Sequence, residues 1–415
     1  MGKPKIRFKG FTEEWEQRKL GEIYSSIGNA FVGTATPYYV EQGHFYLESN
    51  NIKDGQINRN TEIFINDEFY EKQKDKWLHT GDMVMVQSGH VGHSAVIPKE
   101  LDNSAAHALI MFRNSKMEIE PYFLNYYYQT FKFKKKIEEI TTGNTIKHIL
   151  ASDMQEFVVD YADYEEQKQI GEYFRTLDHL ITLHQRKCDE TKKLKKYMLQ
   201  KMFPQNGMKV PEIRFEGFTG DWEQRKLSEI ATMHARIGWQ NLRTSEFLDS
   251  GDYMLITGTD FDDGAINYSA CHYVERERYE QDKHIQIKNG SILITKDGTL
   301  GKVAYVQGLS KPATLNAGVF NVEIKDETEV DNKYLFQYLK APFLMNYVNK
   351  KATGGTIKHL NQNILVDFPV LMPSKAEQEK ISVYFERLDY LITLHQRKCD
   401  ELMKIKKYML QNMFV

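Results

Sequence analysis

The sequence predicts an α+β fold in which two repeated, strand-rich domains are joined by two long antiparallel helices, coiled-coil-like and related by pseudo-two-fold symmetry. Three observations predict it. A short segment recurs at an offset of 207 residues, a long segment recurs at an offset of 211, and the stretches between these repeats diverge. Repeats at a fixed offset mark duplicated structural units. The 415 residues leave room for two or three domains of roughly 150 residues each.

The composition restricts the class of protein. Hydrophobic residues make up 41% of the chain and charged residues 27%, which is ordinary for a soluble globular protein. The formal net charge of −2 excludes a uniformly basic nucleic-acid coat protein but leaves room for a local basic face. Three cysteines exclude a disulfide scaffold and fit a reducing compartment. Because the N-terminus is polar and no apolar run approaches the ~18 residues of a membrane span, we expect a cytoplasmic protein without a membrane segment.

Short repeats recur in the same order in both halves. Residues 6–23 read IRFKGFTEEWEQRKLGEI and residues 213–230 read IRFEGFTGDWEQRKLSEI, with identical residues at 14 of 18 positions. A second motif, Thr-Ile-Lys-His, stands at 145–148 and 356–359 after a glycine-containing turn. The shared order indicates duplication of a whole unit.

Two divergent stretches, residues 24–118 and 231–330, lie between the repeats. Short apolar runs beside glycines predict buried strands there. Turn signals keep their places while the side chains around them change. Two copies of one backbone with different surfaces are typical of a duplicated recognition module rather than of one active site. The strand runs are Met83–Val86 and Ile292–Ile294, and the turns are Asp-Gly at 54–55 and 263–264 and Gly-x-x-Gly at 89–92 and 298–301.

Helices are expected after each divergent stretch. One is predicted near 121–139, where Pro121 suits a first helical position, with a counterpart near 332–350. The long repeat, identical at 27 of 39 positions between 165–203 and 376–414, predicts a long helix in each half. Asp163-x-x-Glu166 and Ser374-x-x-Glu377 have the spacing of capping boxes, and a possible break falls near Asp178 and Asp389.

Apolar residues recur along both long helices in steps of three and four, the pattern of a coiled-coil seam. A helix from Leu177 to Phe203 would be roughly 40 Å long. Two nearly identical stripes can bury each other in an antiparallel two-fold pairing. The alternative is two independent domains in tandem, each packing its own helix on itself, which suits so long a helix less well. The residues expected in the pairing are Leu177, Ile181, Cys188, Met198, Leu388, Ile392, Cys399 and Met409.

These elements divide the chain into four parts. The N-terminal segment and first strand-rich domain cover residues 1–162, and the first helical region covers 163–204. A linker and the second strand-rich domain cover 205–373, and the second helical region covers 374–415.

Motifs that carry chemistry are missing from the sequence. It contains no G-x-x-x-x-G-K-[ST] loop, no G-x-G-x-x-G after a strand and no Asn-Pro-Pro-aromatic motif. It also lacks C-x-x-C and H-E-x-x-H, so a zinc site is not expected. We therefore predict no catalytic residue, no metal ligand and no cofactor in this chain.

The order of these motifs resembles a known family, the specificity (S, HsdS-type) subunits of Type I restriction–modification systems. The resemblance rests on the Thr-Gly-x-Thr-Ile-Lys-His turn, the Glu-Gln-x-x-Ile elements at 166–170 and 377–381, and the elements Gly89–His93 and Gly298–Lys302, all in the same order twice. The chain departs from the family where Ala162 replaces the proline kept as Pro373. His93 likewise stands where the second copy has Lys302.

The resemblance implies a non-catalytic subunit with two target recognition domains, which read a bipartite, spacer-separated target in double-stranded DNA. It implies docking of two modification subunits, which bring S-adenosylmethionine and methylate adenine, and through them of restriction motor–nuclease subunits, which bring ATP and Mg. Two alternatives stay open at this point. One is a stand-alone DNA methyltransferase or nuclease with unrecognised motifs, and the other is a coiled-coil protein adaptor.

Polar residues in the divergent turns are the candidates for DNA contact, since base edges and phosphates are bound by such side chains. In the first half these are Asn50, Asn51, Gln87, Ser88, His90 and His93. In the second half they are Arg236, Trp239, Gln240, Asn241, Arg243, Thr259, Lys296, Thr299 and Lys302. Residues shared by both halves cannot distinguish two half-sites, and they either contact phosphates or close a turn: Asn144, Thr145, Lys147, Thr356 and Lys358.

Overall fold

The computed structural model describes residues 2–143, 147–205, 207–297, 300–351 and 360–414. The chain forms two compact units. Unit 1 contains Met1–Arg186 and Gln396–Val415, and unit 2 contains Lys187–His395. Because each long helix contributes residues to both units, we describe each unit by itself.

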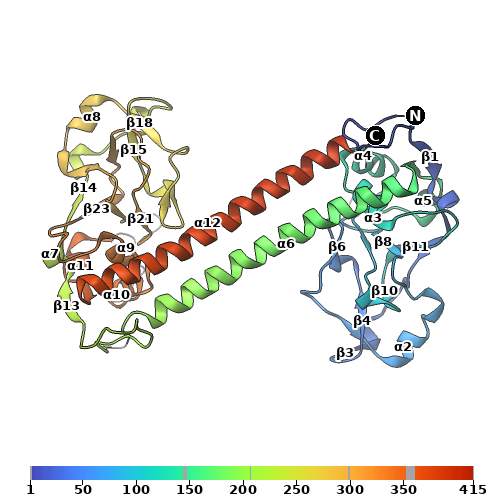
Figure 1. Cartoon of the computed structure of the whole chain (residues 1–415), viewed down its shortest axis with the longest axis horizontal. Helices are drawn as coiled ribbons and strands as arrows, with labels where there is room; N and C mark the ends of the chain where they lie inside the picture. The colour runs from blue at the N-terminus through green and yellow to red at the C-terminus, as the bar shows by residue number, and fades with distance from the viewer. Residues whose placement is uncertain (1, 144–146, 206, 298–299, 352–359, 415) are drawn as a thin grey trace. The chain divides into compact units, whose positions relative to one another are not determined.

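Unit 1 is built on two four-stranded sheets (Figure 1). The first has the order β2-β11-β8-β9 and is antiparallel throughout. The second has the order β10-β4-β7-β3, with β10 parallel to β4. The strands of unit 1 are β1 (Glu16–Lys19), β2 (Tyr24–Asn29), β3 (Tyr39–Val40), β4 (His44–Leu47), β5 (Ile52–Lys53), β6 (Gln56–Ile57), β7 (Phe64–Ile65), β8 (Met83–Val86), β9 (Ser94–Val96), β10 (Ala105–Ala106), β11 (Leu109–Ser115) and β12 (Val158–Tyr161).

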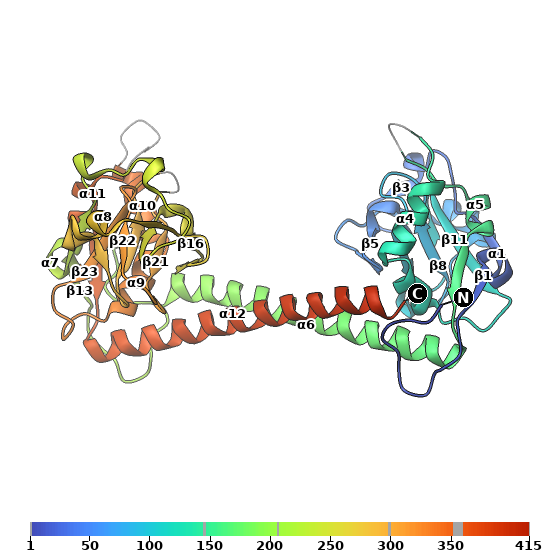
Figure 2. The same cartoon turned by 90° about the horizontal axis from the view of Figure 1, so that it is seen from above.

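Helices complete unit 1 around an apolar core that joins the first sheet to α3 and the start of α6. Both chain termini lie in this unit (Figure 2), where the backbone N–H of Ile6 donates to the carbonyl oxygen of Asn412 over 2.9 Å. The helices are α1 (Leu20–Ile23), α2 (Asp67–Glu71), α3 (Pro121–Tyr127), α4 (Phe131–Ile140), α5 (Ala151–Glu156) and the first part of α6 (Tyr164–Lys201).

Unit 2 repeats the first sheet of unit 1 in the order β14-β23-β20-β21. Its second sheet, β18-β15-β22-β19, also contains one parallel pair, but this pair, β15 and β22, is central, whereas the parallel pair of unit 1, β10 and β4, includes an edge strand. Its strands are β13 (Glu223–Lys226), β14 (Ala231–Ala235), β15 (Tyr253–Ile256), β16 (Phe261–Asp262), β17 (Ala265–Ile266), β18 (His272–Val274), β19 (Gln286–Ile287), β20 (Ile292–Thr295), β21 (Val303–Tyr305), β22 (Ala313–Leu315), β23 (Val319–Ile324) and β24 (Pro369–Met372). Its helices are α7 (Leu227–Ile230), α8 (Arg276–Glu280), α9 (Asn332–Lys340), α10 (Phe343–Lys351), α11 (Gln362–Val366) and the first part of α12 (Lys375–Asn412).

The predicted Asp-Gly turns are present in both units. Asp54 and Gly55 have φ of 50° and 84°, and Asp263 and Gly264 have φ of 43° and 93°. These values suit the tight two-residue hairpins that join β5 to β6 and β16 to β17. The turn positions predicted from the sequence are therefore correct.

The single helix expected near 121–139, and its counterpart near 332–350, are each two helices. In unit 1 the Thr130 hydroxyl accepts from the Phe133 backbone N–H over 3.2 Å and starts α4 separately. In unit 2 Pro342 follows Ala341, whose ψ of 161° is extended, as the residue before a proline prefers.

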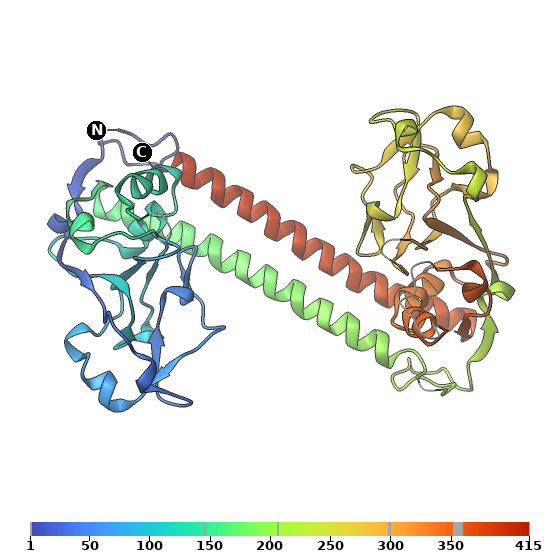
Figure 3. The same ribbon diagram turned by 180° about the vertical axis from the view of Figure 1, so that it is seen from behind.

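The two long helices are antiparallel within each unit. In unit 1 the end of α12 lies beside the start of α6 (Figure 3), and the thiol of Cys399 approaches the carbonyl oxygen of Ile181 at 4.0 Å. In unit 2 Cys188 makes the equivalent approach to Ile392 at 3.8 Å. Each unit thus contains parts of both long helices, so the tandem alternative is wrong and the predicted fold class is confirmed.

Candidate nucleic-acid interface

Buried glutamates of the long helices anchor the short N-terminal repeat of each unit. The Glu166 carboxylate is fully buried and accepts from Arg7 Nε and Nη2, at 2.6 and 2.8 Å, and from Trp15 Nε1 at 2.9 Å. The hydrogen bonding to Glu166 raises the pKa of the Arg7 guanidinium. In unit 2 the Glu377 carboxylate accepts from Nε and Nη2 of Arg214, both at 2.8 Å. The glutamates therefore bind distant arginines and do not form the predicted capping boxes, although Asp163 and Ser374 do accept from the first turns of the helices.

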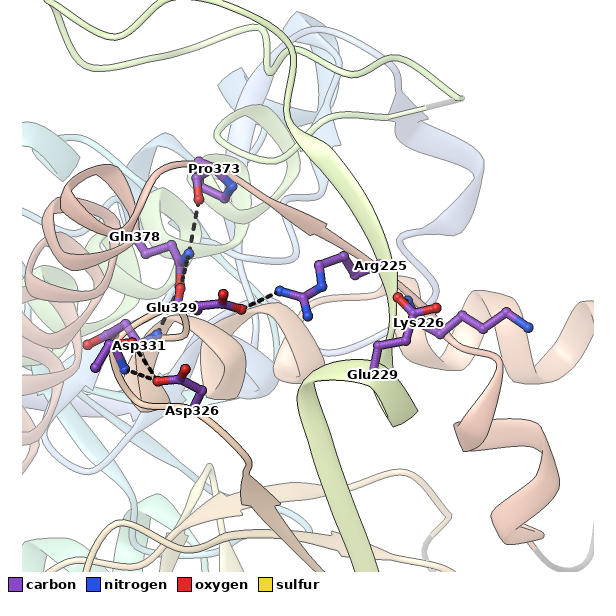
Figure 4. Close-up of polar contacts among 9 residues, drawn as sticks. Arg225, Lys226, Glu229, Asp326, Glu329, Asp331, Pro373 and Gln378 are labelled. Carbon is purple, nitrogen blue, oxygen red and sulfur yellow. Dashed lines mark hydrogen bonds and ion pairs between the residues drawn. The ribbon is translucent and has the colours of Figure 1, made fainter.

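The neighbouring glutamines fix the loop that precedes α3 and α9. In unit 1 the Gln167 amide donates to Ala162 O at 2.7 Å and accepts from the Glu120 N–H at 3.0 Å. In unit 2 Gln378 donates to Pro373 O and Glu329 O, both at 3.0 Å, and accepts from the Asp331 N–H (Figure 4). At Ala162 and Pro373 the glutamine amides bind only the backbone carbonyl groups. The alanine that replaces proline in unit 1 therefore leaves this hydrogen bond unchanged.

A further repeated pair joins the two long helices within each unit. Lys406 Nζ of α12 lies 2.7 Å from Asp178 of α6, which also accepts from the Tyr126 hydroxyl at 2.9 Å. In unit 2 Lys195 lies 2.5 Å from Asp389, which accepts from Gln337 at 3.0 Å. Burial lowers the pKa of Lys195. Helices α6 and α12 run unbroken through these aspartates, so the expected break is wrong.

The residues that both units share, and whose contacts are described, therefore build the scaffold. The side chains that differ between the units lie in the turns. In unit 1 the turn Gly89–His93 connects β8 to β9 and borders an open pocket of about 320 Å³. His90, His93 and Lys147 all line this pocket. The Gly89 N–H donates to Lys147 O at 3.2 Å, and the Ile149 N–H donates to Gln87 O at 3.0 Å. The structure therefore brings together five of the predicted positions: Gln87, Ser88, His90, His93 and Lys147.

The other two candidates of the first half, Asn50 and Asn51, directly precede β5 and are not among the residues that line this pocket. Asn50 is exposed, whereas Asn51 is 2% exposed. The Asn51 amide donates to Asn58 O and Thr61 O, both at 2.9 Å, and its oxygen accepts from the Glu48 N–H. Asn51 therefore holds its own loop, and we leave it out of the proposed DNA-reading residues.

Two candidates of the second half are also buried. Arg236 is 1% exposed, and its guanidinium donates to Leu315 O at 2.9 Å and to Gln240 O at 3.2 Å. Gln240 is 4% exposed, donates to Asp282 at 3.3 Å and accepts from the Ile237 N–H. Both side chains hold the loop after β14, so we withdraw them as base readers.

The remaining described candidates of unit 2 are more accessible. Asn241, Arg243, Thr259 and Lys302 are exposed, and Lys296 is half-buried, with its ammonium 5.5 Å from the centre of the Phe320 ring. Outside the described residues lie Asn144, Thr145, Thr299, Thr356 and Lys358, and the side chain of Trp239.

Sequence reasoning missed Gln129, which lines the unit 1 pocket, and named Lys134 only as part of a basic stretch that faces either DNA or solvent. The signal for Lys134 was the lysine-rich stretch 132–136. In that stretch Lys132 pairs with Asp160 at 2.6 Å and Lys136 donates to Val158 O at 3.1 Å, which leaves Lys134 and Lys135 exposed. No sequence pattern pointed to Gln129.

Two features are absent from the described ranges. Within them, no three His, Cys, Asp or Glu side chains gather as ligands for a metal ion. No helix among these residues combines the length and apolar character needed to cross a membrane.

Duplicated scaffolds that carry different polar turns define a protein with two recognition modules. Residues 12–193 and 219–404 match the family model for the Type I restriction modification DNA specificity domain, and these segments make up well over half of the chain. The chain belongs to this family, the specificity subunits of Type I restriction–modification systems.

Individual relatives extend this similarity along the chain. The MjaVIII specificity subunit of Methanocaldococcus jannaschii is 21% identical over 410 residues, which cover 95% of this chain and 91% of that protein. The EcoBI specificity subunit of Escherichia coli is 20% identical over 375 residues, covering 82% and 74%.

Solved structures share the fold. The S subunit of the Type I system from M. genitalium has a TM-score of 0.66 at 15% identity, covering 100% of this chain and 99% of that one. A chain from a study of complex assembly and conformational transition in a Type I system has a TM-score of 0.52 at 16% identity, covering 96% and 97%. At these identities the similarity shows the fold alone.

Proposed function

We propose that this chain is the non-catalytic, sequence-reading subunit of its restriction–modification complex. Each unit reads one half-site of a bipartite, spacer-separated target in double-stranded DNA. One observation carries the proposal: the buried contacts Arg7–Glu166 and Arg214–Glu377 are the same in both units, while the turn after the central strand ends in His93 in one unit and Lys302 in the other. A shared scaffold with different turns suits two half-sites of different sequence, which need not be palindromic.

The DNA-reading residues that we propose are those that stay accessible in the structure. In unit 1 they are Asn50, Gln87, Ser88, His90, His93 and Lys147, and in unit 2 they are Asn241, Arg243, Thr259, Lys296 and Lys302. Lysine and arginine suit phosphates and guanine, and amide and imidazole groups suit base edges.

Two modification subunits dock on the long helices. Exposed apolar side chains support this, because they recur at the same offset of 211 residues: Leu194 and Tyr197 are 44% and 48% exposed, and Ile405 and Tyr408 are 43% and 58% exposed. Residues three apart share one face of a helix, and adjacent exposed apolar side chains are typical of protein-binding surfaces. The modification subunits bring S-adenosylmethionine, and the restriction subunits that join them bring ATP and Mg.

A domain exchange tests this function. Residues 24–140 are replaced by the matching region of a relative, the complex is expressed, and methylated adenines are mapped across the host genome. We expect one half-site to change while the other half-site and the spacer stay the same. A map in which both half-sites change would contradict the assignment of one half-site to each unit.

A further inference from the structure

The unit 1 pocket lies between the β8–β9 turn and helix α4. Its walls include the buried side chains of Phe133 and Ile137, and its rim carries the exposed side chains of His90, Lys134 and Lys147. Gly92 lies against Ile137 with φ of 86°, where a side chain would be strained and would meet the Ile137 methyl group. The pocket therefore combines an apolar floor with a charged rim, in which Lys134 and Lys147 lie beside the exposed carboxylates of Asp54 and Glu138.

His93 lines this pocket in a fixed orientation. The backbone N–H of Asp54 donates to His93 Nδ1 over 3.3 Å. A ring nitrogen that accepts a hydrogen bond carries no proton, so the neutral ring has its proton on Nε2. His93 thus offers a single hydrogen-bond donor at the far side of the ring.

The hairpin that supplies this N–H is itself held in place. Asn125 of α3 is buried and donates to Gly55 O at 2.8 Å, and the Ser94 hydroxyl donates to Asn125 Oδ1 at 2.8 Å. Strand β9, helix α3 and the Asp54–Gly55 turn are therefore linked directly behind the imidazole. Such support is what a precise contact to a ligand requires.

Burial, more than the charges around it, favours the neutral form of His93. Burial lowers the pKa of His93, Asp54 opposes this, and Lys134, His90 and Lys53 lower the pKa further. Glu138 and Lys147 also line the pocket. At neutral pH the imidazole is a donor without charge, beside lysines that carry the charge.

Unit 2 has different chemistry at the same place. Lys302 stands where unit 1 has His93, and Met345 of α10 stands where unit 1 has Lys134. The Met345 sulfur is the nearest atom to the position that a Gly301 side chain would take. Methionine therefore packs on the turn glycine in unit 2, whereas in unit 1 the nearest side chain to the turn glycine is Ile137 and Lys134 lines the pocket beside it.

We propose that the unit 1 pocket receives the edge of one base pair of the first half-site, with His93 Nε2–H donating to an acceptor atom on that edge and Lys134 and Lys147 binding the flanking phosphates. Purine N7, guanine O6 and thymine O4 are the acceptors that the major groove presents. The inference rests on the proposed DNA-reading function, and it assigns the recognition of one base position in the first half-site to His93. Lys134 is the phosphate contact that unit 2 lacks.

A matched pair of variants tests this assignment in the complex with modification subunits. His93→Gln places an amide N–H near the Nε2 position, and His93→Asn keeps an acceptor for the Asp54 N–H but removes the distal donor. Methylation of a target library randomised over the first half-site is the readout. We expect His93→Asn to reduce discrimination at one base position about tenfold, the size of one hydrogen bond lost at a base edge, and His93→Gln to retain most of it.

Lys134→Met, which copies the residue of unit 2, gives an independent readout on an exposed position. It should weaken DNA binding equally for all first-half-site sequences and reduce the salt dependence of binding by about one phosphate contact. In all three variants, selectivity at the second half-site should equal that of the wild-type complex. This equality shows that the chain is folded. Unchanged first-half-site selectivity in His93→Asn, or unchanged affinity in Lys134→Met, overturns the proposal. A wild-type complex without any bipartite preference would instead contradict the proposed function.

Discussion

Lys406 and Asp178 form an ion pair of 2.7 Å within unit 1, with only 15% and 11% of their side chains exposed. The pair connects α12 to α6 at a point where the Tyr126 hydroxyl also reaches the carboxylate. Removal of one partner from such a pair leaves a buried charge uncompensated, whereas removal of both partners is much less harmful.

Lys406→Met should therefore lower the free energy of unfolding by about 3 kcal/mol. Lys406→Met combined with Asp178→Asn should recover a large part of this loss, and Lys407→Met, at an exposed neighbouring position, should have little effect. Urea unfolding followed by circular dichroism measures all three. A double variant as unstable as the single variant would show that the charge balance is not what holds these helices together.

Glu166→Gln tests the anchor of the N-terminal repeat. The change removes the negative charge that binds the Arg7 guanidinium and should cost about 2–3 kcal/mol of stability. Glu165→Gln is the matched control, since Glu165 pairs with Lys168 on the exposed face of the same helix at 2.8 Å, and such pairs contribute little. Equal destabilisation by both variants would contradict the role of Glu166.

Reading of the first half-site should depend on pH. The pKa of His93 is lowered, chiefly by burial, so near pH 6.5 the folded ring carries less of a proton than the ring of the unfolded chain. The contribution of this ring to stability is therefore present above pH 6.5 and is lost as the pH falls through the folded pKa. A protonated ring cannot accept from the Asp54 N–H.

We thus expect discrimination at the His93 base position to fall as the pH decreases from 7 to 5, with second-half-site discrimination less affected. The same titration with His93→Gln should show no such loss. Binding to fluorescent oligonucleotides at constant ionic strength separates the two half-sites, and a pH dependence retained in the glutamine variant would exclude His93 as its source.

Charge introduced at the proposed docking surfaces should reduce the number of bound modification subunits. Tyr197→Glu and Tyr408→Glu each affect one of the two surfaces, so each should lower the stoichiometry from two modification subunits per chain to one. The double variant should bind neither. Native mass spectrometry counts the subunits, with Lys407→Glu as an exposed control. Full loading of the double variant would rule out these surfaces.

Features that depend on local sequence were predictable. The repeats, the Asp-Gly hairpins and the strands Met83–Val86 and Ile292–Thr295 follow from turn chemistry and periodicity over a few residues. Helices α6 and α12 begin and end within a few residues of the predicted regions.

Features that depend on distant partners were not predictable. Glu166 has the spacing of a cap, but Arg7, 159 residues earlier, binds it instead. Arg236 looks like a DNA-reading arginine, yet its acceptor Leu315 O lies 79 residues along the chain. A basic or polar residue in a turn therefore cannot be assigned to DNA until its internal partners are known.

We propose that the paired long helices set the length of the unread spacer between the two half-sites. An insertion of four helix-forming residues after both Gln185 and Gln396, which lies between the contact Cys399–Ile181 of unit 1 and the contact Cys188–Ile392 of unit 2, tests this most directly. Changing both helices keeps their antiparallel partners matched, adds a little more than one turn and lengthens the pair by ~6 Å.

Single-molecule methylome sequencing of cells with this variant is the decisive measurement. A lengthening of ~6 Å corresponds to one or two base pairs of B-DNA at ~3.4 Å each. We predict that the unread spacer becomes longer by one or two base pairs and that both half-sites keep their sequence. Active methylation with an unchanged spacer, or with altered bases in either half-site, would contradict the claim that the helices set the distance between two independent reading units.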